Sequence, residues 1–344
     1  MFHRIVLCLF FSIHLIANQA THFMGVGSSI IDFLVQVDDD FIAQHIPGQK
    51  GGSIACDQET FDRVVAAIES NPKTALGGSA GNTVRTMAKL GEQSIFISLV
   101  GEDLHGKRYY EEMHEMGISG IVRDPDFTTI CILCLITPEG ERTFLSTCKP
   151  VGWNFKPALE HFQNVKWGHF ESFLLWEAPD FIEQSLFLAH EAGVPVSLDL
   201  SNFLVVGQHK EKLLEWLGKY VDVVFGNESE IGHLTGLSPE EGCMRLQAIC
   251  PIVVVTKGAD GCLVGCQGEL THIPGFSAKV VDTTAAGDYF TAGFIYGLLH
   301  QLPLPVCARI GHRLGSSIIE HIGSELPKEK WQEIRTFMQL EHEF

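Results

Sequence analysis

The sequence predicts an α/β protein built on a doubly wound, mostly parallel sheet with a small β appendage. From about residue 91 onward, short apolar runs alternate with segments of helical periodicity. Such apolar runs are typical of strands buried on both faces, and the intervening helices are the crossovers that parallel strands require. Two stretches, 31–54 and 118–148, break this alternation and are richer in β-branched and turn residues. We expect them to form a small sheet beside a cleft, where it would act as a lid.

The individual elements follow from the same reasoning along the chain. The run from Gly77 to Asn82 opens a helix that ends near Gly91, because small residues start it and a glycine stops it. Further strands are expected at 94–100, 165–170, 194–200, 221–225, 252–256 with 262–265 as its hairpin partner, and 278–281. Further helices are expected at 104–116, 179–192, 210–219, 228–234, 286–300, 305–321 and 327–338.

Composition excludes one broad class of function. The 344-residue chain has 45% apolar residues, enough for a full core, and a formal net charge of −18. A protein without a basic stripe is not expected to bind nucleic acid, although local N–H groups and a metal ion still allow a small phosphorylated ligand. The GxxxxGK[ST] loop is absent, so this is not a P-loop enzyme.

The ten cysteines do not have the spacing of a zinc site. Cys131 and Cys134 lie in an alternating apolar run and are expected to face a core, and Cys262 and Cys266 flank another strand. The histidines are scattered and indicate no metal centre. Many unpaired thiols in a chain of this size fit a reducing compartment.

Polar residues follow four successive predicted strands at the point where each one ends. Asp199 with Ser201, Asn227 with Glu230, Thr256 with Gly258, and the segment 282–288 hold these positions. In doubly wound proteins, ligands bind outside the carboxyl ends of the strands. The pattern therefore predicts a ligand site at this edge of the sheet.

The segment from Asp282 to Asp288 carries the most specific chemistry. Small residues at the start of the 286–300 helix leave its first N–H groups open, and these groups carry the positive end of the helix dipole. Such a helix start receives phosphate or a developing anion, and Asp288 within it is suited to accept a proton. The segment indicates phosphoryl transfer, although a packing turn followed by a capping Asp is the alternative interpretation.

Structural alternatives exist for the other positions too. Asn227 and Glu230 are also explained as a helix cap with a first-turn acid, and 256–261 as a tight hairpin connection. The Gly77-Gly78 pair is either a flexible helix start or a point of close backbone approach to a ligand. Asp32, inside an apolar run, either faces water from an alternating strand or serves a site.

Taken together, these motifs resemble the PfkB (ribokinase-like) family of carbohydrate and nucleoside kinases. The residues that carry the resemblance match in order and spacing from about Gly25 onward. They are Gly77-Gly78-Ser79-Ala80-Gly81-Asn82, Gly101-Glu102-Asp103, Asn227-Glu228-Ser229-Glu230, Thr256-Lys257-Gly258-Ala259-Asp260-Gly261 and Asp282 to Asp288. The resemblance implies a ribokinase-like fold with a β lid and an ATP-dependent kinase as the activity.

The resemblance also implies roles for the residues of the transfer site. Asp288 would be the base that takes the proton from the acceptor hydroxyl, and the backbone N–H groups of Ala285, Ala286 and Gly287 would form the anion hole. Many family members carry Gly where this chain has Ala285, but the site uses backbone N–H groups. The metal ligands implied are Asn227 and Glu230 for Mg²⁺, largely through water, and Asp282 and Thr284 for a monovalent cation, usually K⁺.

Two binding regions complete what the resemblance implies. The ATP-binding residues would be Thr256, Gly258, Gly261 and His312, the last near a position that often lies by the adenine. The acceptor-binding residues would be Asp32, Gly77, Gly78 and Asn82.

The acceptor itself stays open between two classes. Several segments resemble bacterial adenosine-kinase-like members, among them 27–32, 136–143, 198–201 and 318–323. The lid sequence from Phe144 to Pro150 departs from those relatives. We therefore expect a nucleoside, with adenosine favoured, or a sugar such as ribose or fructose.

The N-terminus permits two interpretations of residues 1–23, ahead of a kinase domain at 24–344. A basic start, an apolar run at 5–17 and small residues at 18–20 have the shape of a secretory signal, but the run is too short for a stable membrane span. The other interpretation is a start codon assigned too early, with Met24 near the true beginning. We favour the second, with a cytoplasmic protein, because of the thiols and the implied need for ATP.

Two alternatives of another class remain at this point. One is a non-catalytic nucleoside- or sugar-binding regulatory protein on the same scaffold, and the other is a secreted binding protein. The small molecule is the expected partner, and the chain would be a monomer or a homodimer.

Overall fold

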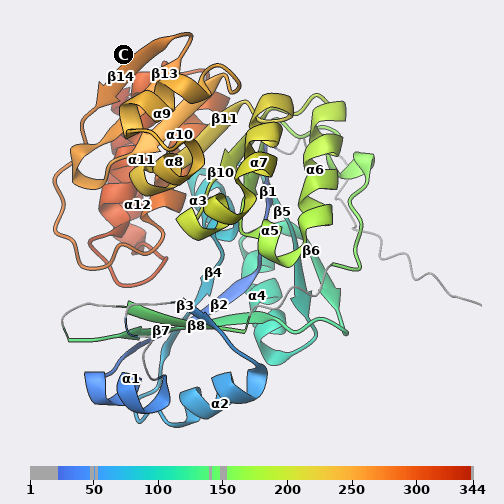
Figure 1. The fold of residues 1–344 in the computed structure, drawn as a ribbon, viewed down its shortest axis with the longest axis vertical. Coiled ribbons are helices and arrows are strands. Elements are labelled where there is room, and N and C mark those ends of the chain that lie inside the picture. Colours follow the sequence, from blue (N-terminus) through green and yellow to red (C-terminus); the bar gives the residue numbers. More distant parts are fainter. Residues whose placement is uncertain (1–21, 47–49, 51–52, 139–141, 148–152, 342–344) are drawn as a thin grey trace, which may run out of the picture.

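A nine-stranded sheet forms the centre of the large domain (Figure 1). The computed structural model describes residues 22–46, 50, 53–138, 142–147 and 153–341. The strand order is β14-β13-β12-β11-β10-β9-β1-β5-β6. The strands from β6 to β12 pair in parallel, whereas β13 and β14 pair antiparallel at one edge. Their bounds are β1 Phe23–Val26, β5 Ser94–Gly101, β6 Ser119–Asp124, β9 Gly168–Glu171, β10 Val196–Asp199, β11 Val223–Asn227, β12 Ile252–Thr256, β13 Cys262–Cys266 and β14 Glu269–Ile273.

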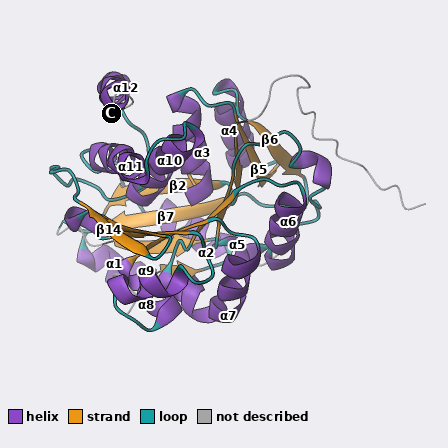
Figure 2. Cartoon of the chain, turned by 90° about the horizontal axis from the view of Figure 1, so that it is seen from above, coloured by secondary structure: helices purple, strands orange, loops and turns teal. Residues whose placement is uncertain are grey.

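Helices cover both faces of this sheet, as Figure 2 shows from above. Because side chains alternate along a strand, adjacent residues such as Phe23 and Met24 enter different hydrophobic clusters, one on each face. The predicted doubly wound, mostly parallel sheet is confirmed. One face packs against α3 (Ser79–Leu90), α4 (Leu104–Glu115), α10 (Ala286–Leu299) and α11 (Leu304–Ile318); the other packs against α5 (Leu174–Glu177), α6 (Pro179–Glu191), α7 (Phe203–Lys219), α8 (Glu228–Thr235) and α9 (Pro239–Leu246). Helix α12 (Lys328–Glu341) packs on α11, and two short 3₁₀ turns are η1 (Leu159–His161) and η2 (Gly258–Asp260).

A second sheet of five strands lies at one end of the molecule (Figure 1). Its order is β3-β8-β7-β2-β4. One face buries Ile31, Phe33 and Val35 in the core with residues of the two helices α1 and α2, while Asp32 lies on the opposite face. The bounds are β2 Ile30–Gln36, β3 Ser53–Ala55, β4 Lys73–Gly77, β7 Ile130–Ile136, β8 Arg142–Ser146, α1 Asp39–His45 and α2 Gln58–Ala66.

The limits of this small sheet differ from those expected. The predicted lid segment 118–148 includes β6, but β6 pairs in parallel with β5 and so belongs to the large sheet. The first segment, expected at 31–54, extends to β4, which pairs antiparallel with β2. Both differences arise from pairing across the sheet, which local composition does not reveal. Residues 139–141, within the segment 136–143 quoted above, and residues 148–150 of the lid sequence lie outside the described residues.

One predicted strand is wrong, and the strands β1, β4 and β14 lie outside the predicted segments. Residues 278–281 form no strand; instead Val281 and Asp282 donate their N–H groups to the carbonyl of Ile319 at the end of α11, and Val280 is exposed. The exposed strand β14 completes the antiparallel edge, and its polar sequence gave no apolar signal. Helix α7 begins at Phe203 rather than at 210 because Asn202 caps it there.

The N-terminal boundary lies at least one residue earlier than expected. Phe23 is fully buried, is the first residue of β1 and pairs with Ser94, so it belongs to the domain. Residues 1–21 lie outside the described residues, and both interpretations of them stay predictions. In the described part of the chain, no helix has the length and apolar character needed to cross a membrane. Cys131 and Cys134 are both buried, as predicted.

Candidate active site

A cavity of about 410 Å³ lies between the two sheets and the carboxyl ends of β10, β11 and β12. The small sheet and the start of α3 form one wall, and strand ends and the start of α10 form the other. Its lining comprises Ile30, Asp32, Ile132 and Phe144 from the small sheet, Gly78, Ser79 and Asn82 from the start of α3, Phe173, Asp199, Ser201, Phe225, Gly226, Asn227, Glu230 and Thr256 near the strand ends, and 283–288 with Thr291 from α10 and the loop before it. The edge of the large sheet that was predicted to bind a ligand therefore borders this cavity.

Asp288 faces this cavity from the first turn of α10. Its Oδ1 accepts a hydrogen bond from Ser79 Oγ at 2.7 Å, and its Oδ2 accepts one from Asn82 Nδ2 at 2.7 Å. Burial raises the pKa of Asp288 to about 6, although these two hydrogen bonds and the charge of Arg85 oppose the rise. Both partners belong to α3, so Asp288 is not simply the cap of its own helix.

The turn that precedes Asp288 has an uncommon backbone. Ala285 has φ 62° and ψ 8°, in the left-handed region, and no side chain caps α10. A left-handed residue before a right-handed one turns successive N–H groups toward one side, which makes an anion-binding concavity. A Cβ on Gly287 would meet no atom within 4 Å, so the space there is open, whereas the N–H of Ala286 donates to Thr283 O at 3.3 Å.

The two glycines before α3 have separate physical reasons. Gly78 has φ +87°, and a Cβ on it would lie 2.1 Å from the carbonyl of Ser28. A Cβ on Gly77 would lie 2.3 Å from the Asp32 carboxylate, so Gly77 leaves the space that this side chain needs. Gly78 lines the cavity and Gly77 does not. The pair is a close-packed junction rather than a flexible helix start.

Asp32 lines the cavity from β2. The strand alternates as expected, but the outward face of the small sheet is a wall of the cavity rather than open surface. Burial raises the pKa of Asp32 to about 7, and the nearby Asp288 and Asp282 raise it further, whereas Arg85 lowers it. A buried carboxylate needs a hydrogen-bond donor, so a ligand with a hydroxyl group would suit Asp32.

Asn227 and Glu230 form a capping box at the start of α8, and both line the cavity. Glu230 Oε2 accepts from the N–H of Asn227 and Oε1 accepts from its Nδ2, each at 2.8 Å. Burial raises the pKa of Asp199, with the charges of Glu230 and Asp288 raising it further. The helix cap and the predicted metal ligands are thus the same residues, and neighbouring carboxylates of this kind suit a cation.

The predicted ATP-binding residues do not all reach the cavity. Thr256 lines it, whereas Gly258 begins the turn η2 between β12 and β13, Gly261 follows that turn, and neither lines the cavity. His312 is buried in α11 with its ring against Phe290 at 4.9 Å between centroids, and burial lowers its pKa to about 4. Their contact with a nucleotide stays a prediction.

Asp282 and Thr284 lie together in the loop before α10. Asp282 Oδ1 accepts from the N–H of Thr284 at 2.7 Å, and Oδ2 accepts from the N–H of Gly323 at 2.9 Å. Asp282 is buried and does not line the cavity, whereas Thr284 does. The carboxylate therefore holds this loop against the turn that follows α11.

Sequence reasoning missed three polar residues that support the site. Ser79 was quoted within a motif but given no role, although it donates to Asp288. Glu171 ends β9, is fully buried, and accepts from the N–H groups of Ser28 and Ala80. Arg85 contacts Asn82 from one turn further along α3. Of the three, only Glu171 could have been found from the sequence, because it is a polar residue at the end of a strand.

The sheet topology defines a doubly wound α/β protein, and the uncapped start of α10 beside Asp288 is suited to an anion. The sequence pattern of the pfkB family carbohydrate kinases matches residues 52–331. The chain belongs to this family. It is therefore a phosphotransferase with an alcohol group as acceptor, and family membership implies ATP and usually Mg²⁺.

Individual relatives are divided between two acceptor classes. The chain is 28% identical to a fructokinase of Vibrio alginolyticus over 250 residues, which cover 69% of this chain and 81% of that protein. It is 22% identical to adenosine kinase 2 of Arabidopsis thaliana over 334 residues, which cover 89% and 95%. The solved structure of adenosine kinase from Sinorhizobium meliloti matches with a TM-score of 0.82 at 24% identity, over 93% of this chain and 100% of that one. The structural match shows the ribokinase-like fold.

Proposed function

We propose that this chain transfers the γ-phosphoryl group of ATP to a hydroxymethyl group of a nucleoside, with adenosine favoured, and that Asp288 is the base. The observation that carries the proposal is the position of Asp288. Its carboxylate faces the cavity from the start of α10, beside the open space at Gly287. A carboxylate in this place can take the proton from an acceptor hydroxyl while N–H groups of 285–287 hold the transferring charge.

The donor set of the cavity fits a divalent cation. Asn227, Glu230 and Asp199 supply oxygen atoms, the ligands that Mg²⁺ prefers. Burial and the negative charge of Glu230 both make ionisation of Asp199 less favourable, and a bound cation would offset this. Both oxygens of Glu230 already accept hydrogen bonds from Asn227, so contact through water is the arrangement we infer. The cation would neutralise charge on the phosphates. For K⁺, we propose Asp282 and Thr284 beside the anion hole.

The proposed acceptor follows from the apolar part of the cavity. Asp32 and Ile132 are direct neighbours across β2 and β7, and Phe144 lies on the same face of the small sheet. Phe173 lines the cavity as well. Apolar and aromatic side chains bind a planar base, whereas Asp32, Gly78 and Asn82 suit the hydroxyl groups of the ribose. The small sheet would then close over the acceptor and exclude water.

A sugar is the second candidate, favoured by the similarity to the fructokinase of Vibrio alginolyticus. The deciding experiment is a phosphoryl-transfer screen of the purified protein with ATP and Mg²⁺, against adenosine, other nucleosides, ribose and fructose, with and without K⁺. We expect the highest kcat/KM with adenosine and stimulation by K⁺. A higher kcat/KM with fructose or ribose than with adenosine would support a sugar as the acceptor instead. Ligand-induced stabilisation without turnover of any acceptor would instead support a non-catalytic binding protein. We also propose a cytoplasmic location, where ATP is available.

A further inference from the structure

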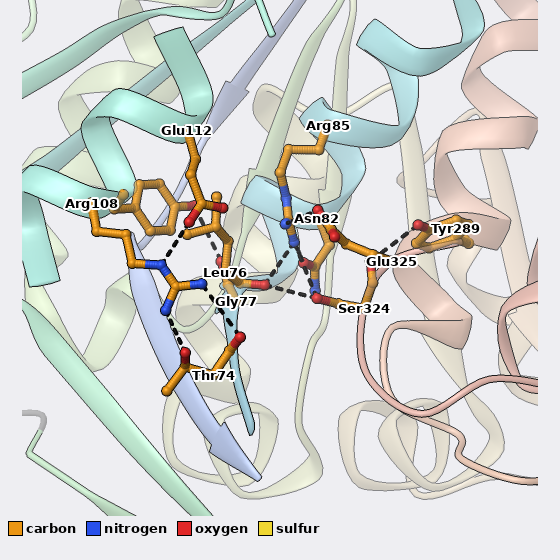
Figure 3. A network of polar contacts seen from close by, with 11 residues as sticks. Thr74, Leu76, Gly77, Asn82, Arg85, Arg108, Glu112, Tyr289, Ser324 and Glu325 are labelled. Atoms are coloured by element: carbon orange, nitrogen blue, oxygen red, sulfur yellow. Dashed lines mark hydrogen bonds and ion pairs between the residues drawn. The ribbon is translucent and has the colours of Figure 1, made fainter. Parts of the chain in front are cut away.

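Arg85 is a buried cation behind the cavity, on the second turn of α3 (Figure 3). Its side chain does not line the cavity. Nη2 donates to the carbonyl of Leu76 at 2.7 Å, to Ser324 Oγ at 3.3 Å and to Asn82 Oδ1. Nη1 lies 3.8 Å from Glu325 Oε1, and Nε has no hydrogen-bond partner among the described residues. A buried charge with so few partners needs another source of stabilisation.

Asn82 links Arg85 to Asp288 and can do so in only one orientation. A guanidinium only donates hydrogen bonds, and an ionised carboxylate only accepts them. The amide oxygen of Asn82 must therefore face Arg85, which directs Nδ2 to Asp288 Oδ2 at 2.7 Å. Arg85 thus fixes which end of the amide meets the carboxylate.

The charges around Arg85 explain why a cation is tolerated here. Arg85 lowers the pKa of Asp32 and opposes the burial that raises the pKa of Asp288. Glu171 and Asp199 lie on neighbouring strands; burial raises the pKa of each, and the charge of Asp288 raises it further. The titratable groups that interact with Arg85 or Asp288 are Asp32 on β2, Tyr109 on α4, Glu171 on β9, Asp199 on β10, Tyr289 on α10 and Glu325 after α11, and Asp282 before α10 acts on Asp32. Arg85 is the cation within this acidic group.

The same guanidinium holds the turn that follows α11. Ser324 Oγ donates to the carbonyl of Leu76, the atom that also accepts from Arg85, and the hydroxyl of Tyr289 donates to Ser324 O at 3.1 Å (Figure 3). The N–H of Gly323 in this turn donates to Asp282. Arg85 therefore connects α3 with the turn that holds the loop before α10.

We propose that Arg85 is a positioning residue for proton transfer, which orients Asn82 toward Asp288 and balances the negative charge of Asp288. This inference rests on the proposed function, in which Asp288 is the base. Arg85 does not touch the acceptor in this scheme. It acts through Asn82 and through its charge.

Two variants separate the two parts of this role. R85M removes the charge and the hydrogen bonds, so we expect kcat to fall by about 10- to 100-fold with KM for the acceptor changed less. The acid limb of the kcat profile should also move upward by about one pH unit, because the ionised base has lost a nearby cation. R85K keeps the charge but loses the planar fork, so the limb should stay in place while kcat falls.

The matched control is R108M. Arg108 lies on α4, where it contacts Glu112 and Thr74, and it is half-exposed with no contact to Asn82 (Figure 3). We expect R108M to keep the wild-type pH limb and kcat. Equal losses in R108M and R85M, or wild-type kcat in R85K, would overturn the positioning role.

A readout without turnover keeps this test separate from that of the proposed function. Protein labelled with ¹³C at Asp carboxyl carbons is titrated by NMR, and D288N identifies the Asp288 signal. We expect the pKa of Asp288 to rise by about one unit in R85M and to stay near the wild-type value in R108M. An unchanged pKa in R85M would reject the inference even if the wild-type enzyme phosphorylates an acceptor. If R85M does not fold, the kcat of R85K decides, because the positioning role requires that it fall while R108M keeps the wild-type value.

Discussion

Glu171 accepts a hydrogen bond from the N–H of Ala80 at 2.6 Å, and so the end of strand β9 holds the N-terminus of helix α3. Its second oxygen accepts from the N–H of Ser28 at 2.7 Å. We expect Glu171→Ala to lower the free energy of unfolding by about 2 to 5 kcal/mol, because two buried N–H groups lose their acceptor. Urea unfolding at pH 6 measures this.

The control for this substitution is Glu112→Ala. Glu112 pairs with Arg108 at 2.6 Å, but both side chains are half-exposed. An exposed pair of this kind contributes about 0 to 1 kcal/mol. If Glu171→Ala were no more destabilising than Glu112→Ala, the carboxylate would not be supporting the start of α3.

Asp288→Asn tests the assignment of the base. The amide cannot accept the proton of the acceptor hydroxyl, so kcat should fall by about two to three orders of magnitude. Binding of ATP and of the acceptor should be largely kept, because the side chain has nearly the same shape. Single-turnover kinetics with calorimetric affinities measure both quantities, and near-normal turnover would remove Asp288 from this role.

The pH dependence of stability follows from the same carboxyl group. The folded pKa of Asp288 is about 6, above its ordinary value of 3.8, so the folded state binds more protons between these values. Its favourable contribution is complete below about pH 4 and is lost as the pH rises through about 6. Asp288→Asn removes this loss, and the ligand-free variant should exceed the wild type in stability by about 1 to 3 kcal/mol at pH 8. The difference should shrink toward pH 4.5 in urea unfolding; a constant difference would contradict the shifted pKa.

Ala285→Gly tests the strain in the turn before α10. Ala285 has φ 62°, and a left-handed conformation costs a residue with a Cβ about 1 to 2 kcal/mol. Glycine removes that cost but adds about 0.4 to 1 kcal/mol through the entropy of the unfolded chain. We expect a gain of up to about 1 kcal/mol in thermal unfolding, and Ala286→Gly, at a right-handed position, to destabilise instead. A loss of stability in Ala285→Gly would show that the turn is not strained.

Phe144→Ala distinguishes a nucleoside acceptor from a sugar. Loss of aromatic contact with a base should raise KM for adenosine by about 5- to 150-fold, equivalent to about 1 to 3 kcal/mol. KM for ribose should change little, because ribose has no base. Phe187→Ala is the control, since Phe187 is 46% exposed on α6 and does not line the cavity. Equal effects on adenosine and ribose would argue against a base at Phe144.

The large sheet was predictable because its strands are buried on both faces and separated by periodic helices. The predicted strand 252–256 matches β12 residue for residue. Local sequence does not report pairing, so β14, with its polar sequence Glu269–Ile273, was missed. Likewise, the apolar residues at 278–281 predicted a strand that has no partner in the described structure. The correct assignments rested on apolar runs that alternate with periodic helical segments, and not on apolar content alone.

The candidate site was predictable where a motif places several groups next to one another, as at 282–288. Contacts between distant segments were not, because they depend on the fold. Asp199 and Glu230 lie on different elements, and no spacing predicts that each alters the other's protonation. In the sequence, Arg85 cannot be told from any other helical residue. Its burial becomes apparent only in the folded structure.

In the proposed function, the two walls of the cavity divide recognition of the acceptor from the transfer chemistry. The face of the small sheet that lines the cavity carries Asp32, Ile132 and Phe144, whereas the groups proposed for proton and phosphoryl transfer belong to the large domain. If this division holds, new residues at these lid positions would alter which alcohol is accepted while the transfer machinery stays constant. An ancestral enzyme of this architecture could thus diverge toward sugars or nucleosides mainly through changes in β2, β7 and β8.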